Sequence, residues 1–485
     1  MKRFSLFLLI LFVFASCDFD NPCVSECCDE DAQWYNGKYL VRYNSSSEKV
    51  AAWDTGYATG IKSDVYRNNR KHERPKKYMG DGLYRKDNEL LLKSLSDFRK
   101  NPEYSPPVLV KEICTNYKVG EKKLFYVDKK HVYATLKYSG EKCLVWHTED
   151  FDSVVFADNT CFEQLGKKFD EIYEIETDLF GSNKNYLVSM SDLYITEIED
   201  KVSIVVTKCE SDVNGYFAFG DLLKWSNGNQ LQMFYIDSKL LKKNKNEAFI
   251  TLVHEFQHLL GFIHDKVVHN IKDGYECWYT EMLSCLSEDI LLDCLGGNQW
   301  ENAVSLLYTF KRNYNYGVTC WYDYGEKNTV SYAVNYAFAA YLFRNYGGAD
   351  FLKSLTHSNY SGKEAVTFAL EANGYNFTFD DVVENFYQVL INTLPARSED
   401  ELTLNREIRF TSCGRSFKAQ AINLRKLPIC RNVYDRKNPC FFSAGIDGQV
   451  ELGAYGFALS KIGDMDENEL DISYPDNKNV KIFVH

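Results

Sequence analysis

The side chains best suited to chemistry lie in the segment Ala248-Phe-Ile-Thr-Leu-Val-His254-Glu255-Phe-Gln-His258-Leu-Leu-Gly261. On a helix, His254 and His258 leave the same face one turn apart, where their imidazoles can share one Zn2+ at about 2.0 to 2.1 Å. Glu255 is rotated by about 100° from His254, so it stays out of the ligand set but close to an open metal position. There it can accept a proton from a metal-activated water. The alternative, a solvent-facing histidine pair with a helix-stabilising glutamate, is disfavoured by the apolar residues around the motif.

The third ligand has two candidates. Glu281 lies on a segment whose apolar spacing predicts a second helix, and it would complete a set of two histidines and one glutamate. His264 is the other candidate, because His254-Glu-x-x-His258-x-x-Gly261-x-x-His264 satisfies the metzincin pattern, in which the glycine breaks the helix. Metzincins need a methionine turn beneath the metal, and Met282 falls inside the predicted second helix. We therefore favour Glu281 and interpret His264 as lining the cleft or lying behind the ligands.

A resemblance to a known family rests on these residues. The His254-Glu-Phe-Gln-His258 motif, followed by Trp278-Tyr-Thr-Glu281-Met-Leu-Ser, resembles the hyicolysin family of zinc metallopeptidases, in particular its lipoprotein members in spirochaetes. The resemblance covers about residues 120 to 395 and implies a gluzincin-like endopeptidase. It implies His254, His258 and Glu281 as zinc ligands and Glu255 as general base. Further matching segments are Phe169-Asp-Glu-Ile-Tyr173, Phe180-Gly181, Gly215-Tyr-Phe217, Phe234-Tyr-Ile-Asp237 and Tyr336-Ala-Phe-Ala-Ala-Tyr341-Leu-Phe-Arg-Asn-Tyr-Gly347-Gly348.

Two positions depart from the wider gluzincin pattern. Thr280 replaces the common Asn before the ligand, and Cys285 stands where some gluzincins have an acidic partner for the first histidine. Glu288 lies seven residues beyond Glu281, on the same helical face, and is a possible substitute partner for an imidazole N–H. We favour the simpler interpretation of Glu288 as a solvated surface residue.

Peptide hydrolysis also needs a group that stabilises the oxyanion of the tetrahedral intermediate. Tyr332 lies fifteen residues before Gly347, which resembles the placement of the catalytic tyrosine in related gluzincin aminopeptidases. Tyr336, one helical turn later, is the second candidate. The sequence contains 34 tyrosines, so a role in the core is the alternative for either residue.

The candidate chemistry leaves the class of function open in two respects. A surface adhesin or binding protein could retain a catalytically silent zinc site, although Glu255 has no use in a purely structural site. An aminopeptidase would need a cluster of groups for the substrate's α-amine, and no clear signature for one is present. We therefore favour an endopeptidase acting on proteins or peptides, with residues 231–236 as a candidate edge strand that pairs with the substrate.

The N-terminus predicts export. Lys2 and Arg3 precede an apolar run from Leu6 to Ala15, as in a secretory signal peptide over residues 1–16. Cys17 follows small residues in a loose lipobox, so we expect a lipoprotein anchored to a bacterial membrane through Cys17. Ordinary cleavage with release of a soluble protein is the alternative. The fourteen other cysteines of an exported chain predict disulfides, whose pairing the spacing does not give.

The net charge limits the possible partners, and the spacing of apolar residues predicts the architecture. Lys and Arg total 56 and Asp and Glu total 68, a net charge of -12 that disfavours nucleic acid as a partner. We expect an α+β, zincin-like fold with a largely antiparallel sheet followed by a helical half, plus a small C-terminal β domain. The expected divisions are a Cys-rich tether at 17–32, an N-terminal region and possible prosegment at 33–107, a metallopeptidase domain at 108–395 and the β domain at 396–485.

Overall fold

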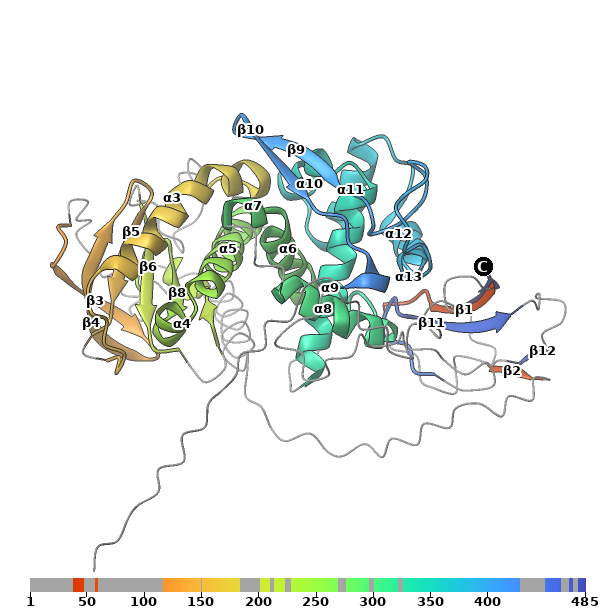
Figure 1. Ribbon diagram of the computed structural model, residues 1–485, viewed down its shortest axis with the longest axis horizontal. Coiled ribbons are helices and arrows are strands. Elements are labelled where there is room, and N and C mark those ends of the chain that lie inside the picture. The colour runs from red at the N-terminus through yellow and green to blue at the C-terminus, as the bar shows by residue number, and fades with distance from the viewer. Residues whose placement is uncertain are drawn as a thin grey trace, which may run out of the picture.

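The computed structural model has a six-stranded sheet with helices against one face, a helical middle, and a small sheet that includes the C-terminal strand (Figure 1). The leader, Cys17, the tether and most of the 33–107 region lie outside the described residues, so the expectations for them stay predictions. The structure describes residues 38–47, 57–59, 117–149, 151–183, 201–209, 213–222, 228–268, 276–295, 301–321, 326–427, 450–463, 471–473 and 479–485.

The large sheet has the strand order β3-β4-β5-β6-β8-β7. The alternating apolar pattern of about residues 108 to 147 predicts a β-meander, and this is confirmed because β3, β4 and β5 are antiparallel neighbours. However, β5 pairs with β6 and β6 pairs with β8 in parallel, so the sheet is mixed rather than largely antiparallel. The connection from β5 to β6 runs through a long helix, and such a crossover returns the chain in the same direction. The strands are β3 (Lys122–Val127), β4 (Lys130–Ser139), β5 (Cys143–His147), β6 (Val202–Thr207), β7 (Gly215–Tyr216) and β8 (Met233–Asp237).

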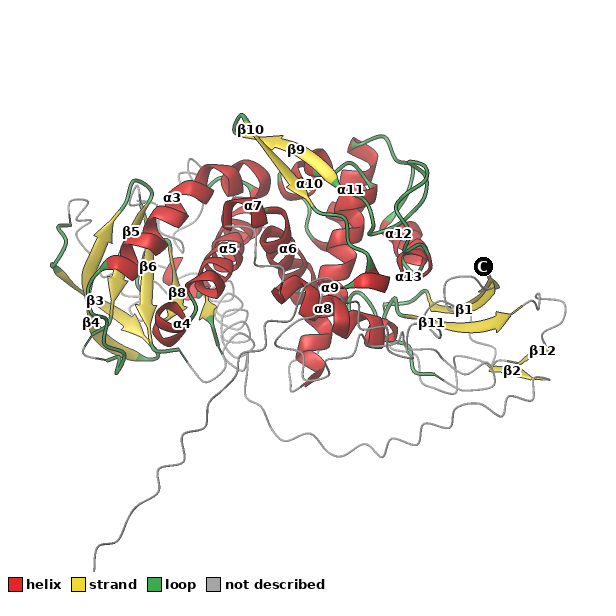
Figure 2. Cartoon of the chain, in the orientation of Figure 1, coloured by secondary structure: helices red, strands yellow, loops and turns green. Residues whose placement is uncertain are grey.

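The crossover helix α3 (Thr160–Phe180) ends at Gly181, whose φ of 104° suits a glycine. Its apolar face packs with the following helices against one face of the sheet (Figures 1 and 2). Phe169 on α3 lies 4.8 Å from Phe256, between ring centroids, and Ile204 and Phe234 of the sheet belong to the same buried cluster. This layer of α3 and the sheet supports the helix that carries the histidine motif.

The predicted helical half is confirmed and follows β8 directly. Asp237 at the end of β8 caps the next helix through its side chain, which accepts a hydrogen bond from the backbone N–H of Leu240. The helices are α4 (Ser238–Lys243), α5 (Lys245–Phe262) with a π-helical extension (Ile263–Val268), α6 (Cys277–Ile290), α7 (Leu292–Leu295), α8 (Glu301–Asn313), α9 (Glu326–Asn345), α10 (Ala349–Thr356), α11 (Gly362–Ala372), α12 (Phe379–Asn385) and α13 (Gln388–Ile391).

The C-terminal part is rich in strands, as expected, but it shares a sheet with the N-terminal region. Strand β1 (Lys38–Asn44) lies between β11 (Phe457–Gly463) and β13 (Val480–Val484) and is antiparallel to both. Phe457 also stacks on Tyr314, which follows α8, so this sheet is continuous with the helical core. Two shorter pairs are β9 (Ile408–Ser412) with β10 (Arg415–Ala419), and β2 (Tyr57–Thr59) with β12 (Asp471–Ser473).

The described cysteines give no support to the expected disulfides. No disulfide is present in the described part of the chain, and thiols remain at Cys143, Cys161, Cys209, Cys285, Cys294 and Cys413. Among the described helices, none is long and apolar enough to cross a bilayer.

Glu176 on α3 is fully buried, and neither of its carboxylate oxygens has a hydrogen-bond partner among the described residues. Burial raises the pKa of this carboxyl well above its usual range, although the charge of His254 opposes the shift. The folded protein therefore keeps Glu176 protonated at a pH where the unfolded chain, with a glutamate pKa of about 4.3, ionises it.

Glu176→Gln should therefore stabilise the fold as the pH rises above about 4.3, and change little below it. We expect its thermal midpoint to exceed that of the wild type by about 2 °C or more at pH 7.5, and to match it near pH 4. Scanning calorimetry at both pH values measures this, with Glu163→Gln, exposed on the same helix, as control. An equal difference at both pH values would contradict the buried-acid explanation.

Candidate metal centre

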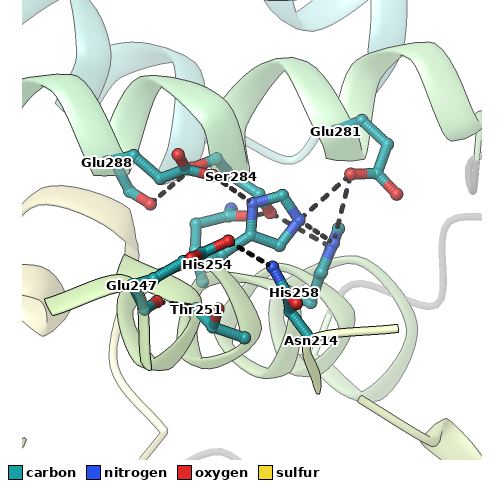
Figure 3. A network of polar contacts seen from close by, with 10 residues as sticks. Asn214, Glu247, Thr251, His254, His258, Glu281, Ser284 and Glu288 are labelled. Atoms are coloured by element: carbon teal, nitrogen blue, oxygen red, sulfur yellow. Dashed lines mark hydrogen bonds and ion pairs between the residues drawn. The ribbon is translucent and has the colours of Figure 1, made fainter. Parts of the chain in front are cut away.

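Two packed helices carry the predicted ligands, α5 with His254 and His258 and α6 with Glu281 (Figure 3). The side chain of Asn244 caps the start of α5 by accepting a hydrogen bond from the Glu247 N–H. Most of the side chains of both helices are buried, because α5 lies between the sheet layer and α6. The imidazoles and the carboxylate meet between α5 and α6.

The three candidate ligand atoms converge closely. His254 Nε2 lies 3.1 Å from His258 Nε2, and Glu281 Oε2 lies 3.2 and 3.4 Å from these two nitrogens. A tetrahedral zinc with bonds of about 2.0 to 2.1 Å places its ligand atoms about 3.3 to 3.4 Å apart. Glu281 Oε2 is buried and receives no well-directed hydrogen bond from a described residue. These separations match those of ligand atoms around one tetrahedral cation, so the residues fit zinc.

The charges of the three side chains are strongly coupled. Burial alone would raise the pKa of Glu281, but the neighbouring His258 and His254 outweigh it and lower that pKa to about 2. Burial would lower the pKa of His254, but Glu281 and Glu288 raise it well above its ordinary value. The pocket thus holds positive charge between two carboxylates. A bound metal ion would replace the imidazolium proton.

Glu288 is a buried partner of His254, not the solvated surface residue that we favoured. Its Oε1 lies 2.7 Å from His254 Nδ1, and the residue is 7% exposed. This contact fixes the ring so that Nε2 faces the other ligands. Cys285, at the position where an acidic partner was missing, lies close enough to form a second possible metal group with His254 and Glu288. The acidic partner of His254 therefore lies three residues after the position that some gluzincins use, which is less than one turn of α6.

His258 has a partner that the sequence did not reveal. Ser284 Oγ lies 3.1 Å from His258 Nδ1 and also donates to the side-chain oxygen of Gln257. Ser284 comes one turn after Glu281 on α6, so one helix supplies a ligand and the partners of both imidazoles. The i+3 and i+7 spacing from Glu281 is the signal that could have identified Ser284 and Glu288 together.

Glu255 lies beside the edge strand β7. It is 6% exposed, and burial raises its pKa, although His254 and His258 oppose the shift. A Cβ on Gly215 would come within 2.6 Å of Thr251 Cγ2 and 3.4 Å of Glu255 Cγ, so glycine is needed for β7 to lie this close to α5. Asn214, which directly precedes Gly215, donates a hydrogen bond to the Glu247 carboxylate on α5 at 3.1 Å (Figure 3).

The prediction of an edge strand at residues 231–236 is wrong. Strand β8 lies inside the sheet, because β6 pairs with one side of it and β7 with the other. The edge beside α5 is β7, which is short and whose Gly215-Tyr216 pair gives little periodic signal. Strand β8 comes shortly before the motif in the sequence, but the strand at the sheet edge beside α5 is β7.

Tyr332 and Tyr336 both lie on α9, at different depths. The Tyr332 ring is 6.5 Å from the His254 ring, between centroids, and is only partly buried. Tyr336 is fully buried near Asp289, and burial raises its pKa well above the usual range. Of the two candidates, only Tyr332 combines closeness to the histidines with partial exposure.

His264 does not join the ligands. The helix does not break at Gly261, because α5 continues to Phe262 and then as a π-helix. His264 Nδ1 contacts Asp265 Oδ1 at 2.8 Å, and among the described residues the possible metal groups contain His254, not His264. His264 instead lines a narrow pocket beside His258, as the interpretation of a cleft-lining residue expected.

The comparison with known protein families agrees with this geometry. The family model described as peptidase M30 matches residues 151–403, which is 253 of the 485 residues. The chain belongs to the peptidase M30 family. This confirms the hyicolysin resemblance, and membership of a metallopeptidase family implies a metal, for which His254, His258 and Glu281 are a candidate group.

A curated protein is similar to part of this chain. The neutral metalloprotease ShpI of Staphylococcus hyicus is 25% identical over 232 residues, which is 44% of this chain and 48% of ShpI. The chain thus spans about half the length of this curated relative. The shared part supports assignment as a metallopeptidase.

Glu288→Ala should weaken zinc binding by about 10- to 100-fold, because His254 loses the partner that orients its ring. Glu288→Gln should lose less, since its side-chain oxygen can still accept the Nδ1–H hydrogen bond. Competition with a chromophoric chelator measures the affinity, and circular dichroism checks the fold. A folded Glu288→Ala protein with a zinc Kd within twofold of the wild type would show that the contact does not support the site.

Proposed function

We propose that this protein is a zinc-dependent endopeptidase in which His254, His258 and Glu281 hold the metal and Glu255 is the general base. The observation that carries the proposal is the convergence of three ligand atoms at 3.1 to 3.4 Å, next to a buried glutamate on the same helix. Family membership supports peptidase chemistry. The name of ShpI as a neutral metalloprotease supports a protein or peptide substrate.

The zinc would act as a Lewis acid that polarises the scissile carbonyl and makes an attacking water more acidic. Glu255 accepts the proton of that water and then gives it to the leaving amine, so the carboxylate must be ionised before attack. Burial holds the pKa of Glu255 above its ordinary value, which strengthens it as a base. Tyr332, whose ring lies 6.5 Å from that of His254, would donate a hydrogen bond to the developing oxyanion.

We also propose that the protein is exported and anchored to a bacterial membrane through a lipidated Cys17. The charged start, the apolar run and the small residues before Cys17 support this proposal. Cys17→Ser should then move the protein from the detergent phase to the aqueous phase in a phase-separation assay. Equal partition of both proteins would favour cleavage and release.

Glu255→Gln should bind one zinc, like the wild type, but cleave a quenched casein peptide at least about 100-fold more slowly, because the general base is lost. Zinc stoichiometry and cleavage rate, measured on the same preparations, test this. A zinc-loaded wild type without peptide cleavage would favour the binding-protein alternative. Equal cleavage by both proteins would remove Glu255 from the mechanism.

Tyr332→Phe should lower kcat by about 10- to 1000-fold with little change in KM, because its hydroxyl acts on charge that forms only in the transition state. Tyr336→Phe is the matched control, since Tyr336 is buried on the same helix. Steady-state kinetics with the quenched peptide separate the two parameters. A fall in kcat for Tyr336→Phe alone would reverse the assignment.

A further inference from the structure

A second cavity, of about 530 Å3, lies away from the metal ligands on the surface formed by α11 and the start of α12. This volume is in the range of typical ligand sites, about 300 to 1000 Å3. Its lining combines aromatic rings and carboxylates, and none of these residues has a role in the proposed reaction. The residues that matter below are Tyr360, Lys363, Glu364, Phe368, Glu371 and Asp380.

Two aromatic rings at the cavity are partly exposed to solvent. Tyr360 is 43% exposed and Phe368 is 38% exposed, and their ring centroids lie 5.4 Å apart. Large exposed rings that lie together on a soluble protein commonly mark a binding surface. The faces of such rings attract the cationic groups of lysine and arginine.

The charged side chains of the cavity make it acidic. Glu364, Glu371 and Asp380 are exposed, and in the described part of the chain their carboxylates form no ion pair. Lys363 carries the positive charge of the lining, and its ammonium donates a hydrogen bond to the Tyr455 hydroxyl at 2.8 Å and lies over the Tyr455 ring, so three carboxylates outnumber one ammonium. The cavity therefore presents three carboxylates beside two exposed rings, which is complementary to a basic segment.

The cavity is also connected to the metal centre. Ser361, next to Tyr360, donates a hydrogen bond at 2.7 Å to Asp265, which lines the pocket beside His258. Gly362 lies against Glu276 at the start of α6, where a Cβ would be 3.3 Å from the carboxylate. Both contacts lie at the end of the helix pair where α5 finishes and α6 begins, and they fix the cavity relative to the ligands.

We propose that this cavity is an exosite that binds a lysine- or arginine-containing segment of the protein substrate while another segment lies at the metal centre. The use of this site in substrate cleavage rests on the proposed peptidase function, whereas binding of the basic segment does not need catalysis. The exposed rings bind the cationic side chains by cation–π contact, and the carboxylates at Glu364 and Glu371 pair with them.

The first test measures binding without cleavage. A fluorescein-labelled Gly-Ser peptide with four lysines is titrated with the full chain carrying Glu255→Gln, and anisotropy gives Kd. Adding Glu364→Gln and Glu371→Gln together should weaken binding by about five- to tenfold, as should Phe368→Ala. Glu399→Gln, an exposed carboxylate outside the cavity, should leave Kd unchanged.

Three outcomes would overturn the exosite: no binding of the lysine peptide, equal loss with Glu399→Gln, or equally tight binding of a matched peptide with four glutamates or four serines. Equal loss with the control would mean attraction by the net charge of the whole protein. Circular dichroism of each variant checks that the fold is retained.

The second test uses two quenched substrates with the same cleaved sequence, one extended by the lysine segment and one by Gly-Ser. The wild type should cleave the lysine substrate with a KM about five- to tenfold lower, and the Glu364→Gln/Glu371→Gln protein should lose this difference while its kcat stays the same. An equal KM for the two substrates in the wild type would overturn the role in catalysis. Absence of all cleavage with intact lysine-peptide binding would instead count against the proposed function alone.

Discussion

The placement of His254 between two buried carboxylates is the constraint on which the rest of the centre depends. Its Nε2 meets Glu281 at 3.2 Å and its Nδ1 meets Glu288 at 2.7 Å, so both nitrogens are committed. Two buried carboxylates without a cation would cost several kcal/mol, and the imidazolium or a metal ion offsets that cost. Because both carboxylates come from α6, the position of α6 against α5 decides whether the centre exists at all.

The layers around this pair explain how that position is held. Strands β5, β6 and β8 and helix α3 form one side, and ring contacts such as Tyr173 with Phe256, 5.5 Å between centroids, fix α5 on them. On the other side, α6 packs against α9, where the buried pair of Asp289 and Arg344 joins the two helices at 2.9 Å. Removing one partner of such a pair is expected to cost about 3 to 5 kcal/mol.

Local patterns in the sequence predicted the helices whose formation depends on residues close together in the chain. The helix with the i and i+4 histidines and the second helix that carries Glu281 needed only periodicity. Glu288 was misjudged because burial by another helix leaves no mark in its own segment. The parallel pairs of the sheet, the edge strand β7 and the pairing of β1 with β11 across more than 400 residues depend on contacts far apart in sequence, which periodicity does not encode.

The central claim is that two histidines and Glu281 share one zinc while Glu288 orients the first histidine. Anomalous diffraction at the zinc absorption edge, from crystals of the zinc-loaded wild type, tests it most directly. The account predicts one peak within about 2.0 to 2.2 Å of His254 Nε2, His258 Nε2 and a Glu281 oxygen, with His254 Nδ1 still bonded to Glu288. A zinc bound by His264 in place of Glu281, or no peak between α5 and α6, would contradict it.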